Sequence, residues 1–323
     1  MGYAIIGVLI GHIIVFGEIH ESGLISVISW LSLLIHTKGF LFLSGFGVFY
    51  SMNKDNNAWH FYIRRFYKFL LPFLVVAMPY FLVVTLANDG NFIYYLGKIT
   101  TIDFWIFGNY HGMWYVAVLL VLYIITPPIY YWLIVDYKFL WVKILFLLLI
   151  VFSINELIAF SNPEYWSLVK IGLSQIPCFF IGILFAYLSI NISDRHLFYV
   201  VLLLLVILYI ISIIWDVVPG DYCSPLIWIP CFILLFSLFF MWTNSASCLR
   251  WINYLYRWFG KYTFELYILH IYLWFIIKEV CHLSAIWNII LAVFLAIIFA
   301  IPMRWATNKV SSWMLGTINK SNS

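Results

Sequence analysis

The chain has 323 residues, of which 65% are hydrophobic and 9% charged, and its mean hydropathy is +1.03. Soluble domains average about 45–50% apolar and about 25% charged residues, so this composition excludes a soluble globular protein. A net charge of +4 does not indicate nucleic-acid binding, because the basic residues lie in short gaps between apolar runs. Five scattered cysteines without a Cys-x-x-Cys spacing indicate neither a zinc site nor a disulfide framework.

Ten apolar stretches are long enough to cross a bilayer as helices. They cover residues 1–19, 31–52, 69–87, 113–135, 141–160, 168–190, 196–215, 224–243, 262–280 and 285–303. The first stretch lacks a basic n-region and a small-residue cleavage site, so it is not a signal peptide. Continuous apolar runs do not fit the alternating segments of a membrane barrel. We therefore predict an all-α, polytopic membrane bundle of about ten helices.

The basic residues favour one orientation of this bundle. If the N-terminus is cytoplasmic, all Lys and Arg residues fall in inner segments except four, which are Lys38, Lys98, Lys170 and Lys278. The positive-inside rule then predicts that both termini are cytoplasmic. The longest predicted loops, 53–68 inside and 88–112 outside, are too short to fold alone. We expect a single domain over residues 1–323, with 304–323 as a short cytoplasmic tail.

The first predicted helix carries one ionisable side chain, His12. It lies ~16 Å along the helix from Met1, near the middle of a hydrocarbon layer ~30 Å thick. Gly7 and Gly11 would let another helix approach closely beside it. Two roles stay open for His12. It is either an imidazole that bonds a neighbouring helix, or a general base, since imidazole titrates near neutral pH.

The second and third predicted helices are linked by a basic cluster, Arg64, Arg65 and Lys68. Such clusters either set topology and bind anionic lipid or bind phosphate groups through charge-assisted hydrogen bonds. Ser44 and Gly45, in the second helix, suit close helix packing, and we expect the serine to bond its own helix backbone. No Gly-x-Ser-x-Gly nucleophile elbow surrounds it.

At the start of the fourth predicted helix, Trp114 and Tyr115 have the character of interfacial aromatic anchors. Tyr123 follows two turns later in the same helix. His36 and His111 are expected near the outer rim, as polar interface residues or as contacts for an incoming glycan.

In the ninth predicted helix, Glu265 is the one carboxylate well inside a predicted span. Lys261, four residues earlier, is positioned to pair with it. Tyr267 and His270 share a helix face, whereas Glu265 and His270 lie ~140° apart and do not suit a dyad. We expect His270 to be structural or to line a site.

Four local patterns together resemble the acyltransferase family 3, the integral-membrane O-acyltransferases that modify surface glycans. Residues 2–12 match a first-helix pattern with Gly2, Ala4, Val8 and His12. The second pattern is 36–46 (His-Thr-Lys-Gly-Phe-Leu-Phe-Leu-Ser-Gly-Phe) followed by 62–72 with its basic cluster before Pro72. The third is 112–116 (Gly-Met-Trp-Tyr-Val) continuing to Tyr123, and the fourth is 260–270 (Gly-Lys-Tyr-Thr-Phe-Glu-Leu-Tyr-Ile-Leu-His). Each pattern is weak alone, but four in the right order are fairly specific.

The resemblance implies transfer of a short acyl group, acetyl first, from cytoplasmic acetyl-CoA or another acyl-CoA to hydroxyls of a surface polysaccharide or its lipid-linked precursor. It implies a bacterial cytoplasmic membrane and no metal. His12 is then the catalytic residue, and Arg64, Arg65 and Lys68 bind the donor. Residues expected to line the substrate site are His36, Ser44, Trp114, Tyr123, Glu265, Tyr267 and His270.

The chain departs from the family where a basic residue eleven positions before His12 is replaced by Met1. Three explanations stay open, namely an upstream start, a truncated chain, and the α-amino group of Met1 acting as the cation. An alternative function is a glycan or small-metabolite transporter or flippase. His12, Glu265 and His270 would then couple transport to protons, but the chain shows no repeat symmetry between its halves.

Overall fold

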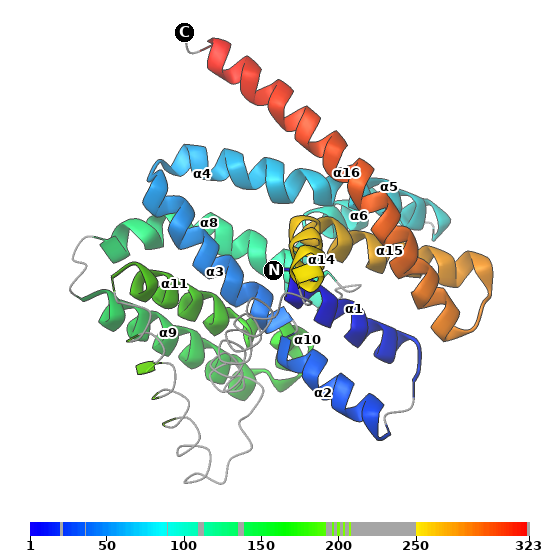
Figure 1. The fold of residues 1–323 in the computed structure, drawn as a ribbon, viewed down its shortest axis with the longest axis horizontal. Helices are drawn as coiled ribbons and strands as arrows, with labels where there is room; N and C mark the ends of the chain where they lie inside the picture. The colour runs from blue at the N-terminus through cyan, green and yellow to red at the C-terminus, as the bar shows by residue number, and fades with distance from the viewer. Residues whose placement is uncertain are drawn as a thin grey trace. The chain divides into compact units, whose positions relative to one another are not determined.

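The computed structural model describes residues 1–19, 22–35, 37–88, 90–108, 113–134, 139–191, 196, 199–200, 203, 207 and 250–321. Every secondary-structure element in these ranges is helical, as predicted (Figure 1). The predicted spans at 196–215 and 224–243 lie almost wholly outside the described residues. His36 and His111 lie outside them as well.

The chain divides into two compact units. The first contains Met1–Leu33, Tyr62–Thr100 and Leu255–Ser323, and the second contains Leu34–Phe61 and Thr101–Tyr254. Each unit therefore combines segments that are distant in sequence. The sequence-based assignment of a single domain stays a prediction.

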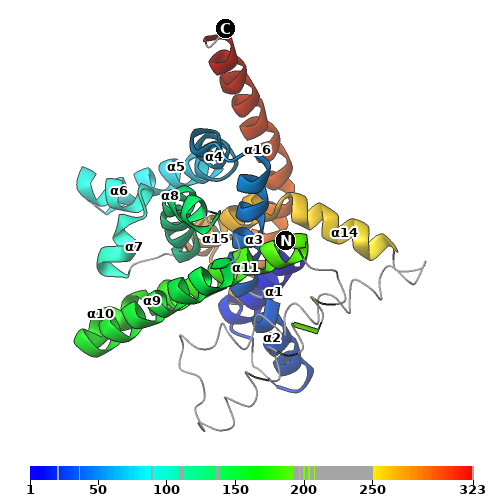
Figure 2. The ribbon, with the colours of Figure 1, turned by 90° about the vertical axis from the view of Figure 1, so that its left-hand side faces the viewer.

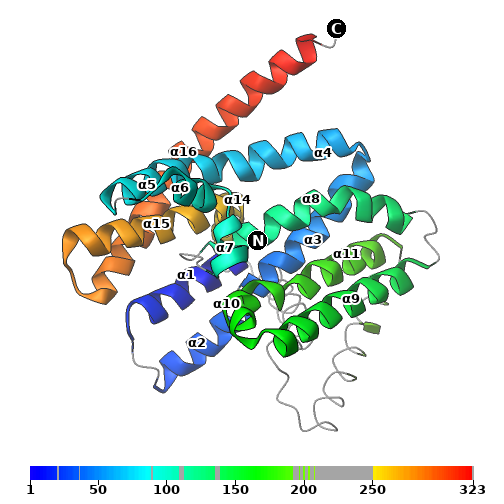
Figure 3. The same cartoon turned by 180° about the vertical axis from the view of Figure 1, so that it is seen from behind.

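The first unit is built around an antiparallel hairpin of α15 (Thr263–Cys281) and α16 (Ala285–Ser321), whose helices lie side by side in Figures 1 and 3. The turn between them begins at His282, which has φ +47°. Helix α1 (Gly2–Phe16) packs against both helices of the hairpin, and α5 (Leu71–Ala87) packs against α15. Ile277, Ile289 and Ala292 form an apolar cluster that Ile13 and Phe16 extend from α1. Apolar packing thus fixes the far end of α1 against the hairpin.

The second unit is centred on α3 (Thr37–Lys54) and α11 (Ile176–Asn191). Helices α8 (Trp114–Ile134), α9 (Leu140–Ser161) and α10 (Pro163–Leu173) complete its packing, with the short α7 (Ile102–Phe107) against α8 and α10. A Cβ on Gly45 would collide with the backbone of Phe179, and one on Gly182 with the backbone of Phe42. Glycine at both positions therefore allows α3 and α11 to touch backbone to backbone. The two helices lie side by side in Figure 3.

By length and composition, five helical stretches in the described part of the chain can cross a membrane. They are Ala58–Ala87, Trp114–Ile134, Leu140–Ser161, Pro163–Ile190 and Ala285–Trp313, with Gly2–Phe16 as a shorter apolar helix. The protein is therefore a multi-pass membrane protein. The count of about ten spans and the cytoplasmic termini stay predictions.

Several segments expected to be loops are helical instead. The predicted inner loop 53–68 contains α4 (Ala58–Arg65), and the predicted outer loop 88–112 contains α6 (Phe92–Ile99) and α7. Their polar residues made them look like loops, but side-chain caps start α4 and α6. Asn57 accepts the backbone N–H of His60, and Asn91 accepts that of Tyr94.

Three further helical segments were not expected from the sequence. They are α2 (Leu24–Ile35), α14 (Arg250–Lys261) and the continuation of α16 to Ser321 through the expected tail. Helix α14, labelled in Figure 2, is amphipathic and mixes basic and aromatic residues. A search for continuous apolar runs therefore does not detect it.

The basic cluster coincides with a break in helix type. Residues Phe66–Leu70 form a π-helix, η1, between α4 and α5. In an uninterrupted α-helix the N–H of residue 72 would bond the carbonyl of Lys68, but Pro72 has no N–H. The helix widens over this turn, and such π-turns occur frequently at functional sites.

Candidate active site

Two helices that carry sequence motifs, α1 and α15, run parallel and in register within the first unit (Figure 1). Gly2 packs against Gly260 at the end of α14, just before α15 begins. Along α15, His270 bonds His12 and Trp274 stacks on Phe16 with ring centroids 4.1 Å apart. The two residues of each pair are separated by the same 258 positions. The motifs at 2–12 and 260–270 therefore form the two sides of one interface, which we call the α1–α15 interface.

The centre of this interface is a hydrogen-bonded pair of imidazoles. Nδ1 of His12 lies 2.8 Å from Nε2 of His270, and the ring centroids are 5.1 Å apart. The other nitrogen of His270, Nδ1, lies 2.8 Å from the carbonyl oxygen of Leu266. His270 has no exposed surface, and Tyr267 lies edge-on to its ring at 5.9 Å. His12 is half-buried, so it is the more accessible member of the pair.

The geometry agrees with the two roles considered for His12. It bonds a neighbouring helix, as a packing imidazole would, and it keeps partial accessibility, as a base requires. His270 contacts His12 directly, which makes it a residue of the same site. A dyad with Glu265 is absent among the described contacts, because Nδ1 of His270 bonds the Leu266 carbonyl. The catalytic assignment itself stays a prediction.

The basic cluster belongs to the same unit as the imidazole pair. Arg64 and Arg65 close α4 with partly buried guanidinium groups, whereas Lys68 on η1 is exposed. Phe69, next to Lys68, packs on Phe264 in the first turn of α15 with ring centroids 4.4 Å apart. His270 follows Phe264 by six residues, or about 9 Å along a helix axis. The cluster thus lies roughly two turns along α15 from the imidazole pair.

The predicted pairing of Glu265 with Lys261 is wrong. Glu265 is 5% exposed, and its Oε1 lies 3.5 Å from Nη1 of Arg304 on α16. The Lys261 amine instead lies over the ring of Tyr262, and the Arg304 guanidinium donates to the Lys261 carbonyl. Packing of α16 against α15 places Arg304 next to Glu265. Because Arg304 is distant in sequence, helix spacing alone could not identify it as the partner of Glu265.

In the second unit, Ser44 is buried and its hydroxyl bonds the hydroxyl of Tyr115 at 3.2 Å. The expectation that Ser44 bonds its own helix is therefore wrong, because α8 supplies a partner across the interface. Trp114 and Tyr115 are 6% and 5% exposed. They pack inside the unit and are not interfacial anchors. Tyr123 is also buried, edge-on to Phe61 at 6.2 Å.

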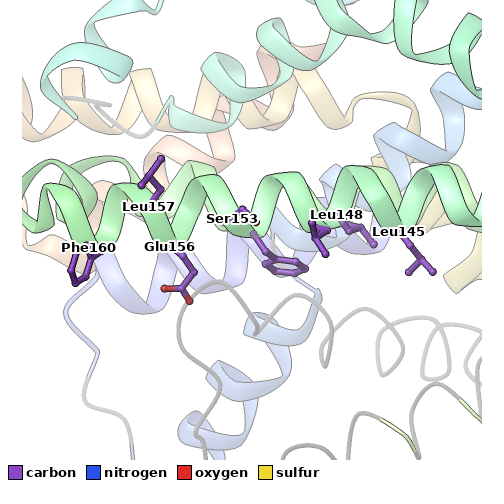
Figure 4. A pocket seen from close by; sticks show the side chains of 8 residues that line it. Leu145, Leu148, Ser153, Glu156, Leu157 and Phe160 are labelled. Atoms are coloured by element: carbon purple, nitrogen blue, oxygen red, sulfur yellow. The ribbon is translucent and has the colours of Figure 1, made fainter.

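An open groove of about 820 Å³ runs along one face of α9 in the second unit. Figure 4 shows its apolar side chains with Ser153 and the carboxylate of Glu156 among them. None of the sequence-predicted site residues lines it, and all its lining comes from a single helix. Among the described residues, no group of three His, Cys, Asp or Glu side chains could hold a metal ion.

These features define a class of protein, a multi-pass helical membrane protein with an imidazole pair held between two of its helices. The family model of the acyltransferase domain, acyltransferase family 3, matches residues 2–305, and the chain belongs to this family. It is therefore an acyltransferase. No curated protein and no solved structure matches the chain.

The sequence analysis missed three contributors to this region. They are the Leu266 carbonyl, the Phe16–Trp274 stack and Arg304. The repeated separation of 258 positions is a signal for the Phe16–Trp274 stack, because Gly2 and Gly260 already belonged to matching patterns, whereas Leu266 lies one helical turn before His270 on the same helix. No local signal identifies Arg304.

Proposed function

We propose that this protein transfers an acetyl group from acetyl-CoA, bound on the cytoplasmic side of a bacterial plasma membrane, to hydroxyls of a surface polysaccharide or its lipid-linked precursor. Membership of the acyltransferase family supports the acyl transfer. The imidazole pair in the α1–α15 interface supports His12 as the group that moves the proton. This pair is the observation on which the proposal chiefly rests.

The chemical step needs one base and later one acid. Nε2 of His12 takes the proton of the acceptor hydroxyl while its oxygen attacks the thioester carbonyl carbon. The new C–O ester bond forms, the C–S bond breaks, and the departing thiolate recovers the proton from the His12 imidazolium. Proton, acyl group and leaving group are then balanced without any further reactant. A positioned acid–base group of this kind contributes typically ~10²–10⁴-fold to a rate.

The donor side of the proposal rests on the cluster of Arg64, Arg65 and Lys68. The phosphates of the donor would bind these cations, and the acyl arm would extend along α15 toward His12. The Phe69–Phe264 contact supports this path, since it joins the cluster to the helix that carries His270. Holding thioester and hydroxyl together in a dry bundle would add catalysis by proximity.

The directions of the helices support the proposed topology. α1 and α15 run parallel, as do α3 and α11, in which Gly45, Phe49 and Tyr50 meet Phe179, Tyr187 and Ser189 in the same order. The predicted bundle makes α1 and α15 its first and ninth spans, and α3 and α11 its second and sixth. Each pair is then expected to cross the membrane in one direction. A cytoplasmic N-terminus would place the basic cluster next to its donor.

The central experiment uses the full chain in proteoliposomes, with acetyl-CoA labelled in the acetyl group and a polysaccharide extract of the cell envelope. We expect label to enter the polysaccharide, and His12→Ala to reduce this at least ~100-fold, as expected for loss of a general base. His60→Ala is the matched control, because His60 is an exposed histidine that bonds Asp55 in the loop before α4. Full activity of His12→Ala overturns the proposal. Glycan movement without thioester consumption would favour the carrier alternative.

A second experiment tests the donor site. Replacing Lys68 by Gln should raise the KM for acetyl-CoA by about tenfold and leave kcat within about twofold, because the side chain contributes binding and not chemistry. Lys54→Gln is the control, since Lys54 is an exposed cation at the end of α3. Equal KM values in the two variants would contradict the assignment of the cluster to the donor.

A further inference from the structure

The Leu266 carbonyl oxygen determines which nitrogens of the imidazole pair donate hydrogen bonds and which accept them. The Leu266 carbonyl oxygen can only accept, so Nδ1 of His270 must carry a hydrogen. A carbonyl has two lone pairs, which lets this one serve both the helix and the imidazole. In a neutral imidazole the second nitrogen is then an acceptor. Nε2 of His270 therefore presents its lone pair to His12.

The same logic extends to His12. Its Nδ1 lies 2.8 Å from the lone pair on His270 Nε2, so Nδ1 of His12 is the nitrogen that carries hydrogen. The lone pair of a neutral His12 is then on Nε2. We propose that His270 is a positioning residue that holds His12 in its Nδ1–H tautomer and so makes Nε2 of His12 the base. This inference rests on the proposed function.

His270 itself is a poor choice for the base. It has no exposed surface, one of its nitrogens bonds its own helix, and the other faces His12. An acceptor hydroxyl would have to displace His12 to reach it. His12 is half-buried on the neighbouring helix. The two histidines therefore have different roles, with His12 in contact with the substrate and His270 behind His12.

The arrangement also stabilises the state after proton transfer. When Nε2 of His12 takes a proton, its Nδ1–H becomes a donor on a cation, and hydrogen bonds from charged donors are roughly twice as strong as neutral ones. His270 accepts that bond and passes polarisation to the Leu266 carbonyl. The Phe16–Trp274 stack lies one turn further along the interface and Tyr267 lies beside His270. These apolar rings lower the local dielectric and strengthen the chain of bonds.

The test reads the tautomer directly. The full chain is labelled with ¹⁵N-histidine in lipid nanodiscs, and the His12 signals are assigned by their loss in His12→Asn. In the unmodified protein we expect a protonated Nδ1 and an unprotonated Nε2. In His270→Leu, which offers no acceptor, we expect a shift toward the Nε2–H tautomer. An Nε2–H tautomer in the unmodified protein, or no change in His270→Leu, overturns the proposal.

Kinetics provide the second readout. We expect His270→Leu to lower kcat about 10- to 100-fold, by analogy with the loss of a hydrogen-bond partner that orients a metal-ligating histidine, with the KM for acetyl-CoA unchanged. His270→Gln keeps an acceptor oxygen and should recover most of kcat, which a merely structural role would not predict. Equal losses in the Leu and Gln variants overturn the proposal. If the tautomer shifts as expected while the unmodified protein transfers no acetyl group, the proposed function fails and the positioning role stands.

Discussion

The α1–α15 and α3–α11 interfaces have similar backbone packing but bring different side chains together. Both are parallel helix pairs in which glycine permits close backbone contact. In the first, Gly2 meets the backbone of Tyr256 and Gly260 at the end of α14, just before α15 begins, and in the second Gly45 and Gly182 bring α3 and α11 together. Beyond its glycines, the first interface brings two imidazoles together. Next to its glycines, the α3–α11 interface brings aromatic rings together, as in the edge-to-face contact of Phe42 with Phe185.

This difference shows that close helix packing and chemistry depend on different residues of an interface. Small residues provide close approach in membrane helices whatever follows, because van der Waals packing drives association there. What an interface can do then depends on the side chains that close approach places opposite each other. Glycine spacing therefore predicts contact, and the next polar position along the helix predicts function. Substitutions at the two interfaces should accordingly affect different properties.

The largest expected effect is on the stability of the second unit. Gly45→Ala places a Cβ against the Phe179 backbone, so it should destabilise the fold by about 1–3 kcal/mol. Gly47→Ala, two residues along the same helix, meets nothing within 4 Å and should be neutral or slightly stabilising. The measurement is the apparent Tm of each variant in detergent. Similar Tm values for the two would show that the α3–α11 contact does not limit stability.

Next in size is an effect on activity at the first interface. A Cβ at Gly2 meets the Tyr256 backbone and presses toward Gly260, so Gly2→Ala should push the start of α1 away from the end of α14, which leads into α15, and so loosen the imidazole pair. We expect kcat to fall about tenfold, or about 1.4 kcal/mol, with little change in Tm. If Gly2→Ala lowers Tm as much as Gly45→Ala and leaves kcat of the folded protein unchanged, the prediction that the first interface governs activity and the second governs stability is contradicted.

The smallest effect concerns the buried hydroxyl pair in the second unit. Ser44→Ala and Tyr115→Phe each remove one partner of a 3.2 Å hydrogen bond and should cost about 1 kcal/mol of stability. The double variant should cost less than the sum, because the singles break the same bond. Unfolding in denaturant measures all three. Strict additivity would mean that the bond contributes nothing.

Much of the fold was predictable because continuous apolar runs identify spanning helices directly. The predicted runs at 113–135, 141–160 and 285–303 coincide with α8, α9 and the first half of α16. The four motifs also led to the family that the chain proves to belong to. Periodicity and pattern suffice where one residue type dominates a segment.

The candidate site was less predictable, because its contacts join segments far apart in the chain. Helix spacing indicated that Glu265 and His270 do not pair, but it could not supply Arg304 as the partner of Glu265 or His12 as the partner of His270. Short amphipathic helices such as α14 were missed, since their charged residues interrupt the apolar run that identifies a span. Side-chain partners across helices require the packed structure.

The separation of 258 positions between His12 and His270 also bears on how the protein is made. The first helix leaves the ribosome long before its counterpart exists, and at about 5–20 residues per second the wait is on the order of 10–50 s. During biosynthesis the early imidazole must therefore rest against lipid, the insertion machinery or a temporary neighbour. Reactivity would arise only as the last hairpin enters the bilayer, so unfinished chains would be inert.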